Sequence, residues 1–345
     1  MKHFIIFMVL IFSGLSFFYY HKEDKAQMIE DRTIRIYASS SFIAKWGPGP
    51  ALKELFEKQN IFKIEFLESP DIAMTLQKIS FENKNSTADL VLGLDQFDLS
   101  RQATKIEWQP ITQTITADYV PDIERALKNQ TRFMAYDWAP MTFVGRQDMS
   151  VQVNQLEDLL KPELKGRIAL QDPRTSSPGL QMLIWIFETK PTEQAIVFLK
   201  ALMKQAHSFS SSWSGAYGLF KNRQADLVFS YVTSPIYHVV EEKDSTFVSL
   251  EMKEALPLQV EFAGIPATCK NCQGAEQFLR FMLTREAQKI IMAKNYMLPV
   301  VERVKDATEF DAIKVYRTVP VKFYDQDRID KWINQWTEIR KNEGL

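Results

Sequence analysis

Residues 213–238 read WSGAYGLFKNRQADLVFSYVTSPIYH, the pattern of a helix, a strand and the beginning of a second helix. Ser214 is placed to cap a helix from Gly215 to about Gln224. The run Leu227–Tyr231 favours a β-strand, and the threonine and serine before Pro235 are typical of a helix start. A strand that leads into a capped helix is where α/β proteins commonly hold a small ligand. The stretch therefore predicts a ligand site on an α/β fold.

The same stretch is rich in aromatic side chains, and each has a packing interpretation beside the functional one. Phe and Tyr are more often core residues than ligand residues when they are considered one at a time. His238, at the end of the stretch, is expected to pack or cap rather than to bind. The aromatic residues concerned are Trp213, Tyr217, Phe220, Phe229, Tyr231 and Tyr237.

Length and composition exclude several classes of protein. The chain has 345 residues, of which 46% are hydrophobic, so it can bury a large core and is long enough for two domains. A net charge of −1 gives no indication of nucleic-acid binding. Four His and two Cys argue against a multi-ligand zinc site, and no GxGxxG or GxxxxGK[ST] motif indicates a bound cofactor. We therefore expect no metal and no cofactor.

The N-terminal residues 1–20 are predicted to be a signal peptide or an N-terminal anchor. Met1–His3 precede an apolar run, Phe4–Tyr20, and a charged segment follows it. Gly14 and Ser16 are the small pair suitably placed for cleavage, and the run is just long enough to span a bilayer if it is retained. We expect an exported, periplasmic protein; the alternative is a buried N-terminal helix.

Export would place Cys269 and Cys272 in a compartment that permits disulfides. Their CKNC spacing just before a predicted helix favours a small structural disulfide over a redox site, which would need a depressed thiol pKa.

The order of elements predicts two doubly wound halves. Strands are expected at Thr33–Ala38, Ile61–Leu67 and Asp89–Asp95, with helices at Ala51–Gln59 and Asp71–Phe81 between them. Such an alternation of strands and helices is the beginning of a parallel sheet that has helices on both faces.

Two later strands, Arg132–Val144 and Leu258–Ile265, are expected to cross between the halves. We therefore predict a two-lobed α/β fold, with two doubly wound sheets joined by a two-stranded hinge and a cleft between the lobes. Lobe 1 is predicted to comprise residues 33–135 plus 260–345, and lobe 2 residues 136–259.

The order of five motifs resembles the periplasmic thiamine-binding proteins of bacterial ABC importers, within the type II solute-binding superfamily that also holds ferric-ion binders. The resemblance covers residues 33 to about 340. The motifs are WGPGP (46–50), ADLVLGLD (88–95), QDPRTSSPGL (171–180), WSGAYGLF (213–220) and DLVFSYVTSPIYH (226–238).

This resemblance implies the two-lobed type II periplasmic binding protein fold and a binding protein, not an enzyme. It would take up thiamine, thiamine monophosphate or thiamine diphosphate and deliver the ligand to a membrane permease. We expect a monomer, because one closing cleft needs no partner subunit. Tyr296 falls where the family often has Trp, so an aromatic residue is kept. The residues that the resemblance places in the cleft are Trp46, Asp95, Ser176, Ser177, Trp213, Tyr231, Ser234 and Tyr237.

The residue types suit thiamine, whose thiazolium ring is a permanent cation. Aromatic faces attract such a cation by roughly 0.5–2 kcal/mol per contact. Asp95 could pair with the cation or the aminopyrimidine, or could be a helix cap. Ser176 and Ser177 could bind a phosphate at a helix N-terminus, or form an ordinary cap. Arg174 could add positive charge, or form an internal salt bridge.

One position departs from the pattern, because family members commonly carry Tyr-Asp where this chain has Ser39-Ser40. Another small cation or an organophosphate is therefore an alternative ligand. A ferric ion is a separate alternative, although Tyr231 and Tyr237 are not adjacent as a pair of iron-binding tyrosines would be. A thiamine-degrading enzyme on the same fold would need a cysteine nucleophile in the cleft, whereas the two cysteines here lie in the CKNC loop.

Overall fold

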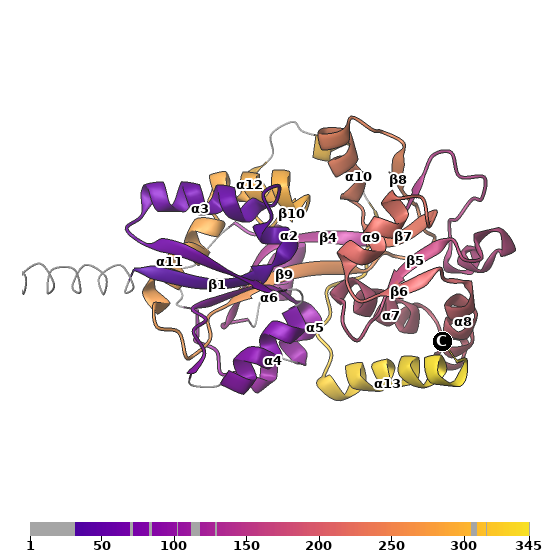
Figure 1. Ribbon diagram of the computed structural model, residues 1–345, viewed down its shortest axis with the longest axis horizontal. Coiled ribbons are helices and arrows are strands. Elements are labelled where there is room, and N and C mark those ends of the chain that lie inside the picture. The colour runs from indigo at the N-terminus through magenta and orange to yellow at the C-terminus, as the bar shows by residue number, and fades with distance from the viewer. Residues whose placement is uncertain are drawn as a thin grey trace, which may run out of the picture.

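The computed structural model describes residues 32–69, 72–82, 85–101, 103–111, 118–127, 130–304, 309–314 and 316–344. The predicted signal peptide or anchor, residues 1–20, lies outside the described residues. Within the described part of the chain, no helix combines the length and apolarity needed to cross a membrane. The chain forms two α/β lobes side by side, with long strands running between them (Figure 1). The predicted two-lobed α/β architecture is confirmed.

Lobe 1 is built around three parallel strands. The central strand β1 (Thr33–Ser39) lies between β2 (Lys63–Ser69) and β3 (Leu90–Asp95). Their apolar side chains form one core on each face of the sheet. The helices of this lobe are α3 (Pro48–Gln59), α4 (Ile72–Glu82), α6 (Pro121–Leu127), α11 (Cys272–Met282) and α12 (Arg285–Asn295).

Two antiparallel strands connect the lobes, β4 (Phe133–Arg146) and β9 (Leu258–Gly264). The first part of β4, Phe133–Pro140, pairs with β9, and the next part, Met141–Val144, pairs with β7 of lobe 2. Because β4 belongs to both halves, ten strands of the described residues form one sheet, along the path β2-β1-β3-β9-β4-β7-β5-β6. The predicted crossing strands are thus present.

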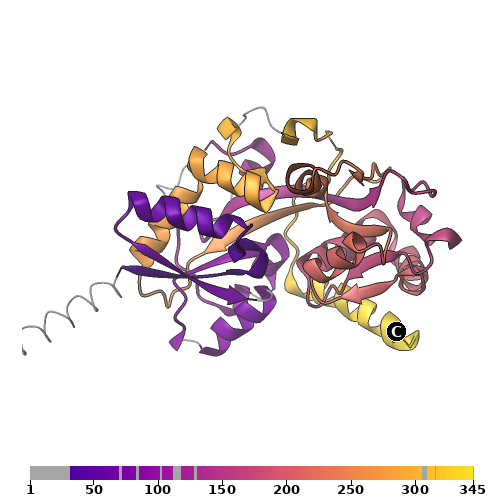
Figure 2. The ribbon, with the colours of Figure 1, turned by 45° about the horizontal axis from the view of Figure 1, so that its top comes forward.

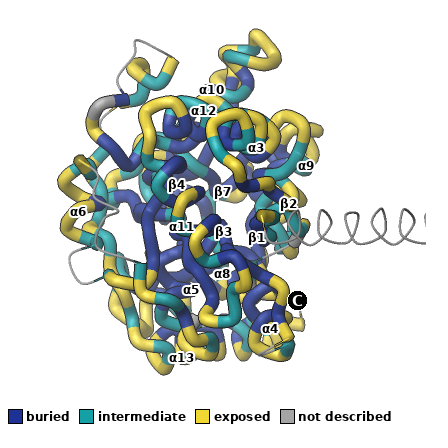
Figure 3. Tube along the Cα trace, turned by 90° about the vertical axis from the view of Figure 1, so that its left-hand side faces the viewer, coloured by how far each residue is buried: buried dark blue, intermediate teal, exposed yellow. Residues whose placement is uncertain are grey.

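Lobe 2 surrounds a largely buried helix, α7 (Ser177–Thr189), which is followed by α8 (Thr192–Gln205) and α9 (Trp213–Lys221). The large apolar side chains of α7 pack into the core of this lobe. Buried strands lie at the centre of the molecule, and exposed residues lie along the outer helices (Figure 3). The strands of lobe 2 are β5 (Ile168–Gln171), β6 (Ser208–Ser210), β7 (Leu227–Tyr231) and β8 (Phe247–Ser249).

The C-terminal helix α13 (Gln326–Asn342) packs on lobe 2, although residues 260–345 were predicted to belong as a whole to lobe 1. Trp332 stacks on Phe187 of α7 with ring centroids 5.8 Å apart, and Trp336 is only 1% exposed. Figure 2 shows α13 beneath lobe 2. The periodicity of an amphipathic helix reveals that one face must be buried, but it does not reveal which lobe will cover that face.

Short elements complete the fold and flank the lobe junction. The predicted disulfide joins Cys269 to Cys272 at the start of α11, where Asn271 caps the helix. The short elements near the junction are α2 (Ser40–Ile43), α5 (Gln96–Ser100), α10 (Ser234–Tyr237), a π-helical turn (His238–Glu242) and β10 (Leu298–Pro299).

Candidate ligand-binding site

Three carboxylates lie side by side where the strands pass between the lobes. The register of β3, β9 and β4 places Asp95 opposite Glu261, and Glu261 opposite Asp137. Residues that are directly opposite on neighbouring strands have side chains on the same face of the sheet. Asp95 is 1% exposed and Asp137 is fully buried. We call Asp95, Glu261 and Asp137 the carboxylate row.

Hydrogen bonds hold two members of the carboxylate row. The Tyr136 hydroxyl donates to Glu261 Oε2 over 2.6 Å, and Asn295 Nδ2 donates to Asp137 Oδ2 over 2.7 Å. Burial, reinforced by the charge of Glu261, raises the pKa of Asp137 well above its ordinary value. Burial also raises the pKa of Glu261, against the opposing effect of the Tyr136 hydrogen bond. Burial therefore leaves the ionised form of these carboxyls poorly stabilised, and a cation beside the carboxylate row would stabilise it.

The two carboxylate oxygens of Asp95 differ in their hydrogen bonds. Its Oδ1 caps α5 by accepting hydrogen bonds from the backbone N–H groups of Phe97 at 2.7 Å and Asp98 at 2.8 Å. Its Oδ2 is buried and has no hydrogen-bond partner among the described residues. Burial raises the pKa of Asp95 to about 6, while the hydrogen bonds of its cap and the nearby Ser177 hydroxyl lower it. The interpretation of Asp95 as a helix cap is thus correct for Oδ1, and Oδ2 takes no part in the cap.

Ser176 and Ser177 lie at the start of α7, next to Asp95. Ser176 occupies the N-cap position, but its hydroxyl makes no capping bond and is buried without a hydrogen-bond partner among the residues that the structure describes. Gly179 allows the helix to begin against β5, because a Cβ atom there would lie 2.7 Å from the carbonyl oxygen of Gln171. This helix start therefore keeps an unused hydroxyl beside its N-terminus, where a polar or anionic group is favoured.

Arg174 forms an internal salt bridge, which is one of the two roles predicted for it from the sequence. Its guanidinium binds Asp172 through Nε at 3.0 Å and Nη2 at 2.6 Å. Arg340 of α13 binds the same carboxylate at 2.9 Å. The two arginines therefore fix the loop that precedes Ser176 and tie it to the C-terminal helix.

A hydrogen-bonded chain orients Trp213 at the start of α9. Its indole Nε1 donates to Ser230 Oγ over 2.8 Å, and Ser230 Oγ lies 2.7 Å from Ser234 Oγ. The indole stacks on Tyr217, with ring centroids 4.8 Å apart. The N-cap of α9 is Ser212, whose side chain accepts from the Gly215 N–H, so the predicted cap at Ser214 is wrong.

Tyr231 connects this indole to the carboxylate row. Its ring centroid lies 6.4 Å from that of Trp213, and its hydroxyl accepts a hydrogen bond from Gln259 Nε2 over 2.9 Å. Burial raises the pKa of Tyr231 well above its ordinary value, and the charges of the carboxylate row raise it further. The tyrosine is therefore close enough to the row to sense its charges.

Tyr237 and Tyr296 meet edge to face, with ring centroids 5.4 Å apart. Tyr296 has a left-handed backbone conformation at φ +54°, and its hydroxyl donates to Glu241 over 2.8 Å. It directly follows Asn295, the residue that binds Asp137. The chain connection through Asn295 therefore places this aromatic pair near the Asp137 end of the carboxylate row.

His238 packs in the core, as expected, because it is fully buried and its ring stacks on Phe247 at 3.5 Å. Trp46 lies in the loop between α2 and α3 with 52% of its surface exposed, and its place in the site stays a prediction. At the departing position, Ser39 caps α2, and Ser40 donates to Glu68 over 2.7 Å.

Sequence reasoning missed Glu261, Asp137 and Ser230. Each is a polar residue inside an otherwise apolar run that becomes a buried strand: LQVEFAG, FMAYDWAP and LVFSY. Burying such a group costs free energy unless it is hydrogen-bonded or functional. A polar residue within an apolar strand pattern was therefore the sequence feature that could have indicated these three positions.

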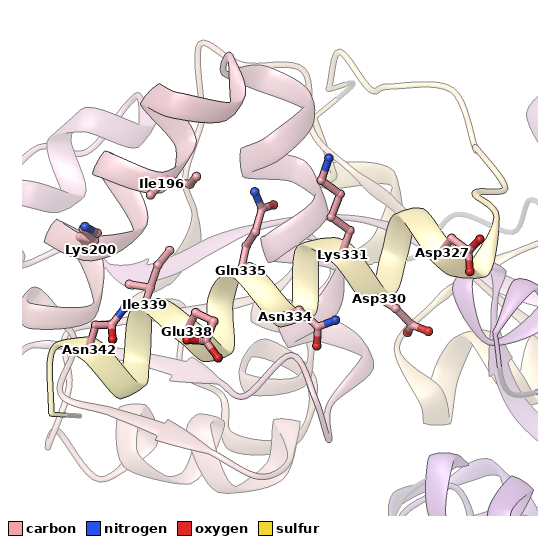
Figure 4. A pocket seen from close by; sticks show the side chains of 10 residues that line it. All are labelled: Ile196, Lys200, Asp327, Asp330, Lys331, Asn334, Gln335, Glu338, Ile339 and Asn342. Carbon is pink, nitrogen blue, oxygen red and sulfur yellow. The ribbon is translucent and has the colours of Figure 1, made fainter.

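A groove of about 650 Å³ lies elsewhere, along α13 and α8. Figure 4 shows its charged and amide side chains, including Lys200, Lys331 and Glu338, along the solvent side of these helices. None of the residues predicted for the site lines this groove. Among the described residues, no three His, Cys, Asp or Glu side chains are placed to hold a metal ion.

Comparison with known proteins identifies the family. Residues 51–316 match the family model of bacterial extracellular solute-binding proteins. A thiamine-binding periplasmic protein of Salmonella typhimurium strain LT2 is 33% identical over 307 residues, which cover 88% of this chain and 92% of the relative. Its counterpart from Escherichia coli strain K12 is 35% identical, over 77% of this chain and 80% of the relative.

Solved structures agree with these relatives. A periplasmic thiamin binding protein superimposes with a TM-score of 0.81 at 31% identity, covering 89% of this chain and 96% of that structure. The apo ferric ion-binding protein A of Pasteurella haemolytica shares the fold, with a TM-score of 0.74 at 13% identity and coverage of 91% and 98%. The chain belongs to the bacterial extracellular solute-binding proteins.

Proposed function

We propose that this chain captures thiamine, or a thiamine phosphate, between its two lobes and delivers it to the membrane permease of an ABC importer. The observation that carries the proposal is that aromatic rings lie near the carboxylate row at the lobe junction, in which Asp95 and Asp137 are buried and Glu261 is half-buried. The relatives that are named for thiamine binding support the same ligand.

The thiazolium ring would lie beside the carboxylate row, with Tyr231 and Trp213 as its aromatic neighbours. A ring face contributes roughly 0.5–2 kcal/mol to the binding of a cation, and more when water is excluded. Asp95 Oδ2 and Asp137 Oδ1 are buried acceptors without donors, and they would interact with the cation or with the aminopyrimidine. Tyr237 and Tyr296 would hold the remaining ring.

The phosphate of a phosphorylated ligand would bind at the start of α7. The support for this is the unused hydroxyl of Ser176, together with the N-terminus of a 13-residue helix. Asp95 lies beside Ser177, so a phosphate there would meet a carboxylate unless the latter were protonated. We therefore expect thiamine to bind at least as tightly as its phosphates at neutral pH.

Capture would proceed by closure of the lobes about β4 and β9, the two strands that join them. We also propose that the protein acts in the periplasm as a monomer, since one closing site needs no second subunit. Cleavage or retention of residues 1–20 would decide whether it is free or tethered, and N-terminal sequencing of the mature protein would distinguish these cases.

Titration of ligand-free protein with thiamine, its monophosphate and its diphosphate, followed by Trp fluorescence, tests the proposal. Thiamine should quench saturably, and Trp213→Phe should remove most of the quenching while leaving a folded protein. Trp108→Phe, in the core of lobe 1, is the matched control and should keep the thiamine-induced quenching. A coloured iron complex, or breakdown of thiamine during incubation, would instead favour the ferric-ion or enzymatic alternative.

A further inference from the structure

Asp137 and Glu261 form a pair on the two strands that connect the lobes. They are direct cross-strand partners in β4 and β9. Each has one oxygen held by a hydrogen bond, from Asn295 to Asp137 and from Tyr136 to Glu261. The register shifts between Ala135 and Asp137, and this bulge allows Tyr136 to reach Glu261. The second oxygen of Asp137, Oδ1, is buried and has no hydrogen-bond partner in the part of the chain that the structure describes.

A second observation points from this pair to a ligand. Gln259 lies two residues before Glu261, on the same face of β9, and is 3% exposed. Its amide nitrogen donates to Tyr231, but its Oε1 is buried and has no hydrogen-bond partner among the described residues. Asp95 Oδ2, on the neighbouring strand β3, is also buried without a partner in the described part of the chain. Three neighbouring strands thus carry, on the same face, buried acceptors that lack donors among the described residues, which suits a cation or an N–H donor.

The surroundings of the pair favour a shared proton. The groups that act most strongly on the pKa of Glu261 are Tyr136, Asp95, Asp137 and Gln259, and Asn295 acts on Asp137 from α12. Tyr231 faces the same carboxylates from β7, and Arg101 acts on Asp95 but is paired with Asp330 of α13. Burial raises the pKa of both carboxyls, and two carboxylates directly opposite each other on neighbouring strands repel when both are ionised, so the pair favours one proton held between its two members.

We propose that the Asp137–Glu261 pair is the counter-charge for the cationic ring of the ligand, and that it gives up its shared proton when the ligand binds. The inference rests on the proposed function, because it requires a cationic ligand. The O–H bond of the protonated carboxyl breaks, the proton leaves to the buffer, and the ligand cation takes its place. The net charge of the site is the same before and after binding.

Two consequences follow from this exchange. Thiamine affinity should increase with pH, by up to about tenfold per pH unit, over the range in which the empty pair holds its proton. A neutral analogue should not displace the proton. The pair would thus select for the charge of the ligand, while the aromatic rings recognise its shape.

Isothermal titration calorimetry of ligand-free protein with thiamine, at pH 7 in buffers of different ionisation enthalpy, measures the protons released per ligand. We expect about one proton released by the wild type. The uncharged aminopyrimidine half of thiamine should release none. Asp137→Asn and Glu261→Gln should each abolish the release and remove most of the pH dependence of the affinity. Asp89→Asn is the matched control: Asp89 is a fully buried carboxylate at the other end of β3, held by backbone N–H groups, and its variant should retain the release.

Thiamine binding without proton release, and with an affinity independent of pH, would overturn the inference and leave the proposed function intact. Full proton release by both Asp137→Asn and Glu261→Gln would also overturn it. Absence of any thiamine binding by the folded wild type would overturn the proposed function and this inference together. The wild-type measurement needs no variant, so it decides the question even if the substitutions prevent folding.

Discussion

Replacing Asp95 by asparagine should make the ligand-free protein more stable at neutral pH and should weaken its binding of thiamine. Burial raises the pKa of Asp95 from its ordinary value of 3.8 to about 6. Because one pKa unit corresponds to about 1.36 kcal/mol, the ionised carboxylate lowers the free energy of unfolding by about 3 kcal/mol at pH 8. Asparagine cannot ionise, and it caps helices as well as aspartate does, so α5 should keep its N-cap.

The sign of the pH dependence follows from the direction of this shift. Between about pH 4 and pH 6, the folded state holds a proton on Asp95 that the unfolded state has lost. The stability contributed by this proton is present below pH 4 and is lost as the pH rises through about 6. The stability difference between Asp95→Asn and the wild type should therefore be near zero at pH 4 and largest at pH 8.

Urea denaturation of both ligand-free proteins at intervals from pH 4 to pH 8 measures this difference. Asp325→Asn is the matched control, because Asp325 caps α13 in the same way but is exposed, and its variant should stay within about 0.5 kcal/mol of the wild type throughout. Thiamine affinity should fall at least about tenfold in Asp95→Asn, the loss of one charge-assisted contact. A variant that is less stable than the wild type at pH 8 would refute the reasoning from burial.

Three further substitutions or treatments test the packing around the site. Ser230→Ala removes the hydroxyl that binds the Trp213 indole, so it should lower the free energy of unfolding by about 1–3 kcal/mol and weaken thiamine binding by about 2- to 30-fold. Chemical denaturation and ligand titration measure these two effects. Ser208→Ala is the control and should change neither, because it removes a hydroxyl that has no partner among the described residues. Trp336→Ala should lower the free energy of unfolding by about 3–5 kcal/mol, because Trp336 is buried in the core of lobe 2. Phe81→Ala is the control, at a position 91% exposed, and should be nearly neutral. Equal decreases in the melting temperature of the two variants would contradict the packing of α13 on lobe 2. Reducing the disulfide between Cys269 and Cys272, which closes a four-residue loop, should cost about 2 kcal/mol and leave thiamine affinity unchanged; lost binding would contradict a structural role.

The sequence predicted the crossing strands and the main helices because their patterns are local. The run Leu227–Tyr231 is apolar and rich in β-formers, and it is β7 in the structure. The position of α13 was predicted wrongly, because its Trp-bearing face packs on α7 and α8, which are more than a hundred residues away in the sequence. The cap of α9 was also misplaced by two residues, since serines flank Trp213 on both sides and only the backbone geometry selects Ser212.

The aromatic part of the candidate site and Asp95 followed from the resemblance to a family, whereas the grouping of Asp95 with Asp137 and Glu261 did not. Asp95, Asp137 and Glu261 are far apart in the sequence, and they become neighbours only through the register of three strands. A bulge in β4 then brings Tyr136 within reach of Glu261. A one-residue change of register would place these side chains on the other face of the sheet, so the grouping depends on tertiary structure that local patterns do not contain.

Equilibrium dialysis of the refolded, ligand-free wild type against thiamine tests directly whether this chain binds thiamine. We predict saturable binding of one thiamine per chain with a submicromolar Kd, competed by an excess of unlabelled thiamine and far less effectively by the same excess of a neutral pyrimidine. A folded sample that binds neither thiamine nor its phosphates would contradict the account, and the solute carried by this two-lobed protein would then have to be a different one.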